Sequence, residues 1–136
     1  MSETEQSWSF SKAKSNMQRG RVLVCAMALH KPRKHWPMDN RAFTLAVRRL
    51  TEKGNPVAKS IRVFDGRAGW CCPDFDEMLS HALSSCLIEY LAPDFKFMVL
   101  GVGPNAIPYL TRDVSKEEMT AAVELVAEFW KEVMGE

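Results

Sequence analysis

Between residues 71 and 86 the chain carries side chains of the types that bind zinc: Cys71, Cys72, His81 and Cys86. Their spacing matches no common zinc pattern, and adjacent cysteines in a strand point to opposite faces. The pair His30 and His35 spans a proline and matches no ligand pattern either. We therefore expect no metal site and no cofactor.

Cys72 is also a candidate nucleophile, because it precedes a predicted helix whose N-terminus would stabilise a thiolate. Nucleophilic catalysis further needs a base beside the thiol or hydroxyl. The sequence contains no Gly-x-Ser-x-Gly motif to supply an alternative nucleophile. We interpret Cys72 as a packing thiol at the end of a strand.

A glycine-containing segment, Gly101–Asn105, follows an apolar strand, which is where phosphate-binding loops occur. It lacks the third glycine, the lysine and the immediate helix of such loops. We interpret it as a turn that leads out of the sheet. No catalytic set is left, so an enzyme is not favoured, and a small enzyme with a ligand loop at 101–105 stays an alternative.

Charge is divided unequally along the chain. Residues 1–56 hold 11 Lys and Arg against 4 Asp and Glu, a balance of +7, and residues 57–136 hold 7 against 13, a balance of −6. Such an asymmetry favours an electrostatically chosen partner, or contact between the two halves of one domain. The acidic part includes glutamates along a predicted C-terminal helix, which form a solvated ridge or a contact for a basic partner.

The basic half centres on residues 31–36, a loop stiffened by proline, and continues into a predicted helix over 40–53. Lysine and arginine neutralise phosphates, and Trp36 offers a face on which a base can stack. The same surface suits an acidic protein, and its charges could also pair with the acidic half of the same domain. The predicted partner-binding side chains here are Lys31, Arg33, Lys34, His35, Trp36, Arg41, Arg48 and Arg49.

Residues 1–18 are polar and predict a flexible N-terminal tail, followed by a single domain over 19–136. In the tail Trp8 and Phe10 alternate with serines, which is typical of a short edge strand folding back on the domain or of aromatic anchors for a partner. The acidic N-terminus is unlike a secretory signal, and Val22–Leu29 is too short to span a bilayer. With no regular cysteine framework, we expect a cytoplasmic protein without a membrane.

The elements that position these residues follow from apolar patterning and from start and stop signals. Continuous apolar runs predict strands over 21–29 and 95–102, and alternation predicts strand 57–64 with a hairpin to 70–72. Helical spacing predicts helices over 40–53, about 74–91 and about 116–133. Asp39 is a good N-cap for the first, while capping boxes at Asp74/Glu77 and Ser115/Glu118 begin the others.

This β-α-β-β-α-β order with a terminal helix predicts an α+β, ferredoxin-like domain, with a three-layer α/β domain as the alternative. For function, we expect a small regulatory or inhibitory protein that binds a protein partner through a bipolar charged surface, with Trp36, Trp8 and Phe10 as aromatic anchors. Nucleic-acid binding by loop 31–36 and helix 40–53 is the alternative. The charge division also predicts a homodimer.

Overall fold

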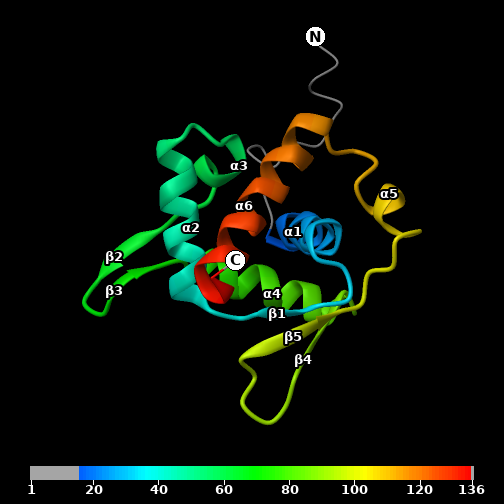
Figure 1. The fold of residues 1–136 in the computed structure, drawn as a ribbon, viewed down its shortest axis with the longest axis horizontal. Coiled ribbons are helices and arrows are strands. Elements are labelled where there is room, and N and C mark those ends of the chain that lie inside the picture. The colour runs from blue at the N-terminus through cyan, green and yellow to red at the C-terminus, as the bar shows by residue number, and fades with distance from the viewer. Residues whose placement is uncertain (1–15, 136) are drawn as a thin grey trace.

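The computed structural model describes residues 16–135, which form the helices and strands drawn in Figure 1. The helices are α1 (Asn16–His30), α2 (Asn40–Glu52), α3 (Pro56–Lys59), α4 (Pro73–Ser84), α5 (Ile107–Leu110) and α6 (Lys116–Met134). The strands are β1 (His35–Pro37), β2 (Phe64–Gly66), β3 (Gly69–Cys71), β4 (Ile88–Tyr90) and β5 (Phe97–Leu100). Residues 16–18 of the predicted tail therefore belong to a helix.

The apolar run predicted as strand 21–29 is wrong, because it forms most of α1, the central helix of the domain. Every side chain from Val22 to Met27 is fully buried, since α4 and α6 pack on different sides of α1. A helix covered all round shows no 3.6-residue period, and a short apolar run then looks like a buried strand. At Gly20 a Cβ atom would lie 2.5 Å from the carbonyl oxygen of Met78, so α1 and α4 approach backbone to backbone.

The predicted helices 40–53 and 116–133 are confirmed as α2 and α6. The Asp39 carboxylate accepts a hydrogen bond from the Ala42 amide at 3.0 Å, and the Ser115 hydroxyl accepts one from the Glu118 amide at 3.1 Å. Both caps follow local sequence signals, and both helices bury a regular apolar stripe.

The predicted strand 57–64 is wrong except at its end, because the segment opens with the short helix α3. Asn55 is buried and its Oδ1 accepts hydrogen bonds from the amides of Val57 and Ala58, both at 2.9 Å. Its Nδ2 donates to the carbonyl oxygen of Ala121 at 3.0 Å, which fastens α3 to α6. The side chain of Asn55 therefore supplies the N-cap that turns this segment into a helix.

The predicted hairpin is confirmed, with β2 and β3 antiparallel and Asp65 opposite Trp70. The predicted helix 74–91 is confirmed only as far as Ser84. The chain then turns through Cys86, at a φ of 63°, and β4 begins at Ile88. The N-cap of α4 is Cys72, so the expected capping box at Asp74 does not form.

A three-stranded antiparallel sheet in the order β1-β5-β4 lies beside the helices, and the hairpin is separate from it. Strand β5 confirms the predicted strand 95–102 over its central residues. With two predicted strands replaced by helices, neither a four-stranded ferredoxin-like sheet nor a layered parallel sheet occurs in residues 16–135. The α+β class is confirmed.

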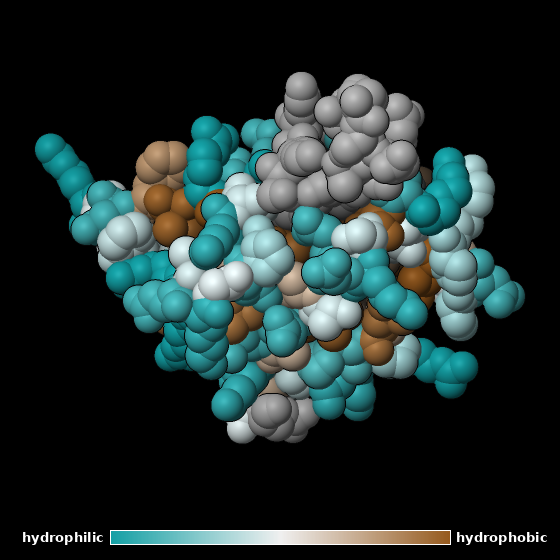
Figure 2. All heavy atoms as spheres, turned by 90° about the horizontal axis from the view of Figure 1, so that it is seen from above, coloured by the Kyte–Doolittle hydropathy of each residue, from teal (hydrophilic) through white to brown (hydrophobic). Residues whose placement is uncertain are grey.

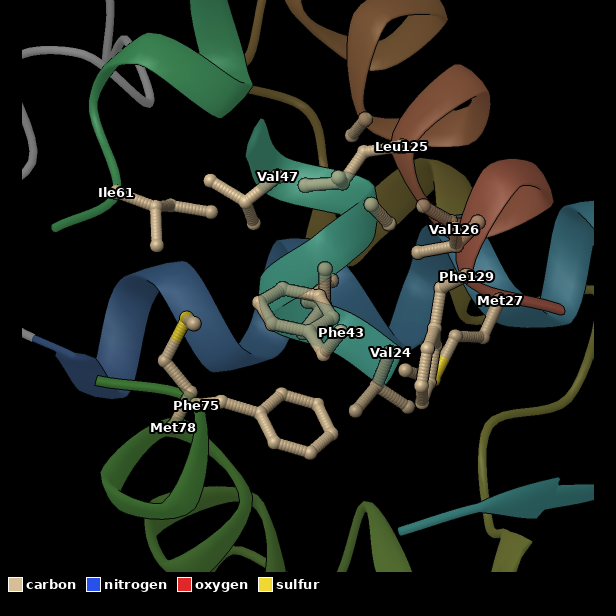
Figure 3. Packing of buried hydrophobic residues seen from close by; sticks show 14 of the residues in the cluster. Val24, Met27, Phe43, Val47, Ile61, Phe75, Met78, Leu125, Val126 and Phe129 are labelled. Atoms are coloured by element: carbon tan, nitrogen blue, oxygen red, sulfur yellow. The ribbon is translucent and has the colours of Figure 1, made fainter. Parts of the chain in front are cut away.

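The core lies where α1, α2, α4 and α6 meet, and Figure 3 shows its side chains converging from these helices. The rings of Phe43 and Phe75 stack with centroids 4.2 Å apart, and Phe129 meets both edge-on. Seen from above, the described surface is largely hydrophilic, with small apolar patches at the left, on the side of the hairpin, and at the right (Figure 2). Among the helices of residues 16–135, none has the length and apolar character needed to cross a membrane.

Candidate partner-binding surface

Trp36, the predicted central anchor, is a core residue and its assignment to the surface is wrong. It is 0% exposed, its ring centroid lies 4.9 Å from that of Trp130, and its Nε1 donates to the carbonyl oxygen of Lys31 at 3.2 Å. The cause is the pairing of β1 with β5, which places Trp36 opposite Met98, and both of these side chains are fully buried in the core.

The basic side chains divide between separate places on the surface. Arg49 on α2 makes ion pairs with Glu128, at 3.3 Å, and with Glu132 on α6. The hydrogen bond that Arg49 donates to Glu128 and the charge of Glu132 raise the pKa of Arg49. This contact is the intramolecular pairing of basic and acidic halves that the charge division allowed, although the side chain of Arg49 stays 51% exposed.

Arg41 and Arg48 lie beside the hairpin. The guanidinium of Arg48 stacks over the ring of Trp70, 4.0 Å from its centroid. Arg41 is exposed and passes so close to Gly69 that a Cβ atom there would lie 3.3 Å from its terminal nitrogen. The hairpin thus turns Trp70, which is 37% exposed, toward two cations of α2.

The side chain of Asn40, at the start of α2, holds the hairpin in this position. Its Nδ2 donates to the carbonyl oxygen of Cys72 at 2.7 Å, and its Oδ1 accepts from the Cys72 amide at 2.9 Å. These two hydrogen bonds satisfy the backbone N–H and C=O of Cys72, next to β3, as a neighbouring strand would. A hollow of about 430 Å³ lies here, lined by Asn40, Arg41, Ala68, Trp70, Cys71, Pro73 and Asp76.

A second hollow, of about 440 Å³, lies between the end of β1, the β4–β5 turn and the end of α6. The Met38 amide donates a hydrogen bond to the carbonyl oxygen of Lys96 at 2.8 Å, which joins these two lining residues. Phe95 stands on its rim and is 54% exposed. The lining residues are Pro37, Met38, Asp39, Asn40, Phe95, Lys96, Phe97 and Val133.

A third hollow, of about 530 Å³, contains the exposed end of the predicted basic loop. Arg33, Lys34 and His35 are all exposed, and Arg33 has a φ of 65° that bends the chain outward. Lys31 lies instead beside the core, with its Nζ 5.8 Å from the ring centroid of Trp130. The lining residues are Arg33, Lys34, His35, Leu91, Phe97, Trp130 and Met134.

These three hollows follow one another, because the first shares Asn40 with the second and the second shares Phe97 with the third. We call them together the partner groove, with a hairpin part, a middle part and a basic part. Its lining residues come from the hairpin, the start of α2, β1, the β4–β5 turn and the end of α6. The hairpin, β1, β5 and β4 lie in the lower part of Figure 1. Arg33, Lys34, Arg41 and Lys96 line it against only two acids, Asp39 and Asp76.

Sequence reasoning missed the aromatic side chains of the groove, Trp70, Phe95 and Phe97. A signal existed for Phe95, which stands between Asp94 and Lys96 just after Pro93, in a turn where an apolar side chain is exposed. Trp70 follows the turn of the predicted hairpin, so its position also indicated an exposed apolar side chain. The predicted anchors Trp8 and Phe10 lie outside the residues that the structure describes.

A larger hollow of about 550 Å³ lies between the end of α2 and α6, and it carries both signs of charge. Glu124 accepts a hydrogen bond from Asn55, at 3.2 Å, and Glu128 is paired with Arg49. Burial, with the nearby charge of Lys31, lowers the pKa of His30 on its wall. Because its carboxylates already have partners within the domain, this hollow is a weaker candidate than the partner groove.

Cys72 and Gly101, which the sequence offered as candidates for catalysis and ligand binding, both take part in packing within the domain. Cys72 is buried, and burial raises the pKa of its thiol to about 12, which outweighs the helix N-terminus. The Gly101 amide donates to the carbonyl oxygen of Leu87 at 2.7 Å, and a Cβ there would lie 3.0 Å from the carbonyl oxygen of Cys86. This glycine therefore serves close packing. Within residues 16–135 no cluster of three or more metal-binding side chains occurs.

Comparisons with protein-family models, with curated proteins and with solved structures found no match.

Proposed function

We propose that this chain is a regulatory or inhibitory protein that binds an acidic, apolar segment of a partner protein in the partner groove. The observation that carries the proposal is that three neighbouring hollows, each sharing a lining residue with the next, carry more cations than acids beside exposed aromatic side chains. Apolar side chains form its floor and Arg33, Lys34, Arg41 and Lys96 stand along it. A cytoplasmic location would suit its free thiols, of which Cys71 and Cys86 are exposed.

The two kinds of side chain would have different tasks. Charges at the rim of an interface mainly set encounter rate and specificity, whereas a few desolvated apolar contacts set affinity. Arg33 and Lys34 at the open end of the groove would steer acidic groups, and Phe95 and Phe97 would contact apolar side chains of the partner.

Several observations favour a protein segment over a nucleic acid. Trp36, the expected stacking face, is buried, and Arg49 is engaged with α6. Nucleic-acid binding is therefore kept as an outcome of the test and not as a second proposal.

The test is selection of a displayed random-peptide library against the full chain. We expect enriched peptides to combine Asp or Glu with aromatic or aliphatic side chains. Arg33→Glu with Lys34→Glu should weaken their binding about tenfold or more, by reversing charge at the basic part. The control pair, Lys59→Glu with Lys116→Glu, also reverses two exposed cations, but outside the groove, and should leave binding unchanged.

Two results would contradict this function. In the first, peptides bind the two double variants equally well. In the second, no peptide is enriched while a fluorescent single-stranded oligonucleotide binds with strong salt dependence, which is typical of phosphate contacts.

The charge division also motivates a proposal of self-association, in which the basic half of one copy faces the acidic half of another. The pairing of Arg49 with Glu128 and Glu132 leaves fewer charges for this contact. Light scattering at tens of micromolar protein should show a dimer that dissociates as salt rises. A monomer at both low and high salt would contradict it.

A further inference from the structure

We propose that the partner segment binds as an added strand on β3, with its backbone hydrogen-bonded to the N–H and C=O of Trp70. The inference rests on the proposed function, and it adds the conformation of the segment and the place where its backbone is held. It draws on three observations in the hairpin part of the partner groove: a side-chain amide that bonds the chain next to β3, an open backbone position beside that amide, and the charge around this position.

The edge of β3 that faces α2 is extended by one residue whose backbone is already paired. The Asn40 side chain bonds both the C=O and the N–H of Cys72, at 2.7 and 2.9 Å. Cys72 has an extended backbone, so the strand geometry of β3 continues to this residue. Asn40 therefore occupies the place that the backbone of a further strand would take beside Cys72.

The neighbouring position along the same edge, Trp70, is open. Backbone groups of residues two apart in a strand point to the same side, so the N–H and C=O of Trp70 point to the side on which Asn40 bonds Cys72. Among residues 16–135, none outside the hairpin forms a hydrogen bond with these two groups. The hollow of about 430 Å³ lies on this side, since Asn40, Arg41 and Trp70 all line it. A donor and an acceptor are thus presented to a segment that enters the hollow.

The charge at this position complements an acidic segment. Arg41 is exposed, and its terminal nitrogen lies beside Gly69, the residue before Trp70. The guanidinium of Arg48 lies over the Trp70 ring, 4.0 Å from its centroid. Asp76 is the one carboxylate among the residues that line this hollow. A carboxylate near the paired residue of the segment can therefore bond Arg41, while an apolar side chain of the segment contacts the Trp70 ring.

The other strand edges within residues 16–135 suit an acidic segment less well. β2 carries Asp65 and β4 carries exposed Glu89, so both place a like charge at the edge. β1 contains Pro37, which has no N–H to donate to a further strand. β5 lies between β1 and β4 and has no open edge. The edge of β3 is therefore the strand edge that best complements the proposed partner.

The first experiment tests the backbone of the bound segment. The probes are the most enriched library peptide, synthesised with a fluorescein label, and a series of the same peptide with one N-methyl group at each position in turn. We expect one position to weaken binding to the full chain about tenfold or more in fluorescence anisotropy, because its N–H donates to the C=O of Trp70. Its two neighbours are the control and should lose less than about threefold, because their N–H groups point away from β3.

Amide hydrogen exchange in the full chain locates the contact. Saturation with the unmethylated peptide should slow exchange of the Trp70 amide about tenfold or more, because this N–H gains an acceptor. The Cys71 amide is the control. It points to the opposite side of β3, so its exchange should change less than about twofold.

A pair of variants tests the charge. Arg41→Gln should weaken peptide binding about fivefold, and Lys59→Gln, which changes an exposed cation outside the groove, should not. A peptide that binds Arg41→Gln as tightly as wild type, that tolerates every N-methyl group, or that leaves Trp70 exchange unchanged would overturn the inference. If such a peptide still depends on Arg33 and Lys34, the proposed function stands without it. If no peptide is enriched, the proposed function fails and the inference fails with it.

Discussion

The helical core and the partner groove use the same kinds of side chain in different ways. In the core, Phe43, Phe75 and Phe129 contact one another and no water, whereas in the groove Trp70 faces the guanidinium of Arg48 and Phe95 is more than half exposed. Trp36 and Trp70 show the difference most clearly, since both stand in short strands near basic residues. Their surroundings, and not their type or their neighbours in sequence, decide which one supports the fold and which one stays at the surface.

The largest effect should come from removing a core ring. Trp36→Ala should lower the free energy of unfolding by about 3–5 kcal/mol, as expected for a fully buried aromatic side chain. Trp70→Ala is the matched change in the groove and should cost less than about 1 kcal/mol, because Trp70 is partly exposed. Urea denaturation measures both. Equal losses would remove the distinction between the two regions.

A smaller effect should follow from the close approach of α1 and α4. Gly20→Ala places a Cβ atom against the backbone of Met78 and should lower the free energy of unfolding by about 1–3 kcal/mol. Gly103→Ala is the control, because a Cβ atom added at Gly103 would meet no other atom within 4 Å. A thermal melt of the Gly20 variant that matches wild type would show that the two helices are not in tight contact.

The charged cluster at Asp74 should make the core sensitive to acid. Burial alone would raise the pKa of Asp74, but hydrogen bonds from Arg62 and Asn16 outweigh it and the pKa is lowered. A lowered pKa in the folded state stabilises the protein above the unfolded value of about 3.9, and this contribution is lost as pH falls through the folded pKa. Unfolding free energy should therefore decrease below about pH 4.

Asp74→Asn removes the titrating group and should lower the free energy of unfolding by about 1–3 kcal/mol at pH 7, since it weakens hydrogen bonds to a charged acceptor. Its stability should also change less than that of wild type between pH 5 and pH 2.5. Asp76→Asn, on an exposed neighbour, is the control. Denaturation curves in which Asp74→Asn keeps the acid sensitivity of wild type would assign that sensitivity to other carboxylates.

The smallest effect on stability should come from the groove itself. Phe95→Ala should change the free energy of unfolding by less than about 0.5 kcal/mol, because the side chain is exposed at a turn. It should nevertheless weaken the binding of library-selected peptides severalfold, because a partner would cover it. Leu83→Ala removes an apolar side chain exposed outside the groove and should leave binding intact. Equal binding by both variants would remove Phe95 from the contact surface.

The elements that could be predicted from the sequence are those marked by neighbouring residues, such as caps, apolar stripes and turn residues. Helices α2 and α6 have an N-cap side chain and an apolar stripe, and the hairpin has Asp65-Gly66. Helix α1 has no apolar stripe, because neighbours far away in sequence bury every side of it from Val22 to Ala28. The end of α4 is also hidden from sequence reasoning, since apolar residues continue at helical spacing to Leu91 after the chain has already turned at Cys86.

The predictable part of the site is its charge. Arg33, Lys34 and Arg41 are recognisable as exposed cations, and they line the groove. Whether an aromatic side chain faces inward depends on strand register, which a sequence does not show: Trp36 is buried because β1 pairs with β5. The ion pairs of Arg49 with α6 are also hidden from the sequence, because they join residues 79 positions apart or more.

The burial of α1 has a consequence for how the chain is made. α1 is synthesised before the two long helices that cover it, and residues 31–115 lie between its end and the start of α6. At about 5–20 residues per second, the ribosome needs roughly 4–17 seconds to make that stretch. For all of that time Val22–Met27 emerges without its final cover. Until α6 has been made, this apolar segment is therefore open to contact with chaperones or with other unfolded chains.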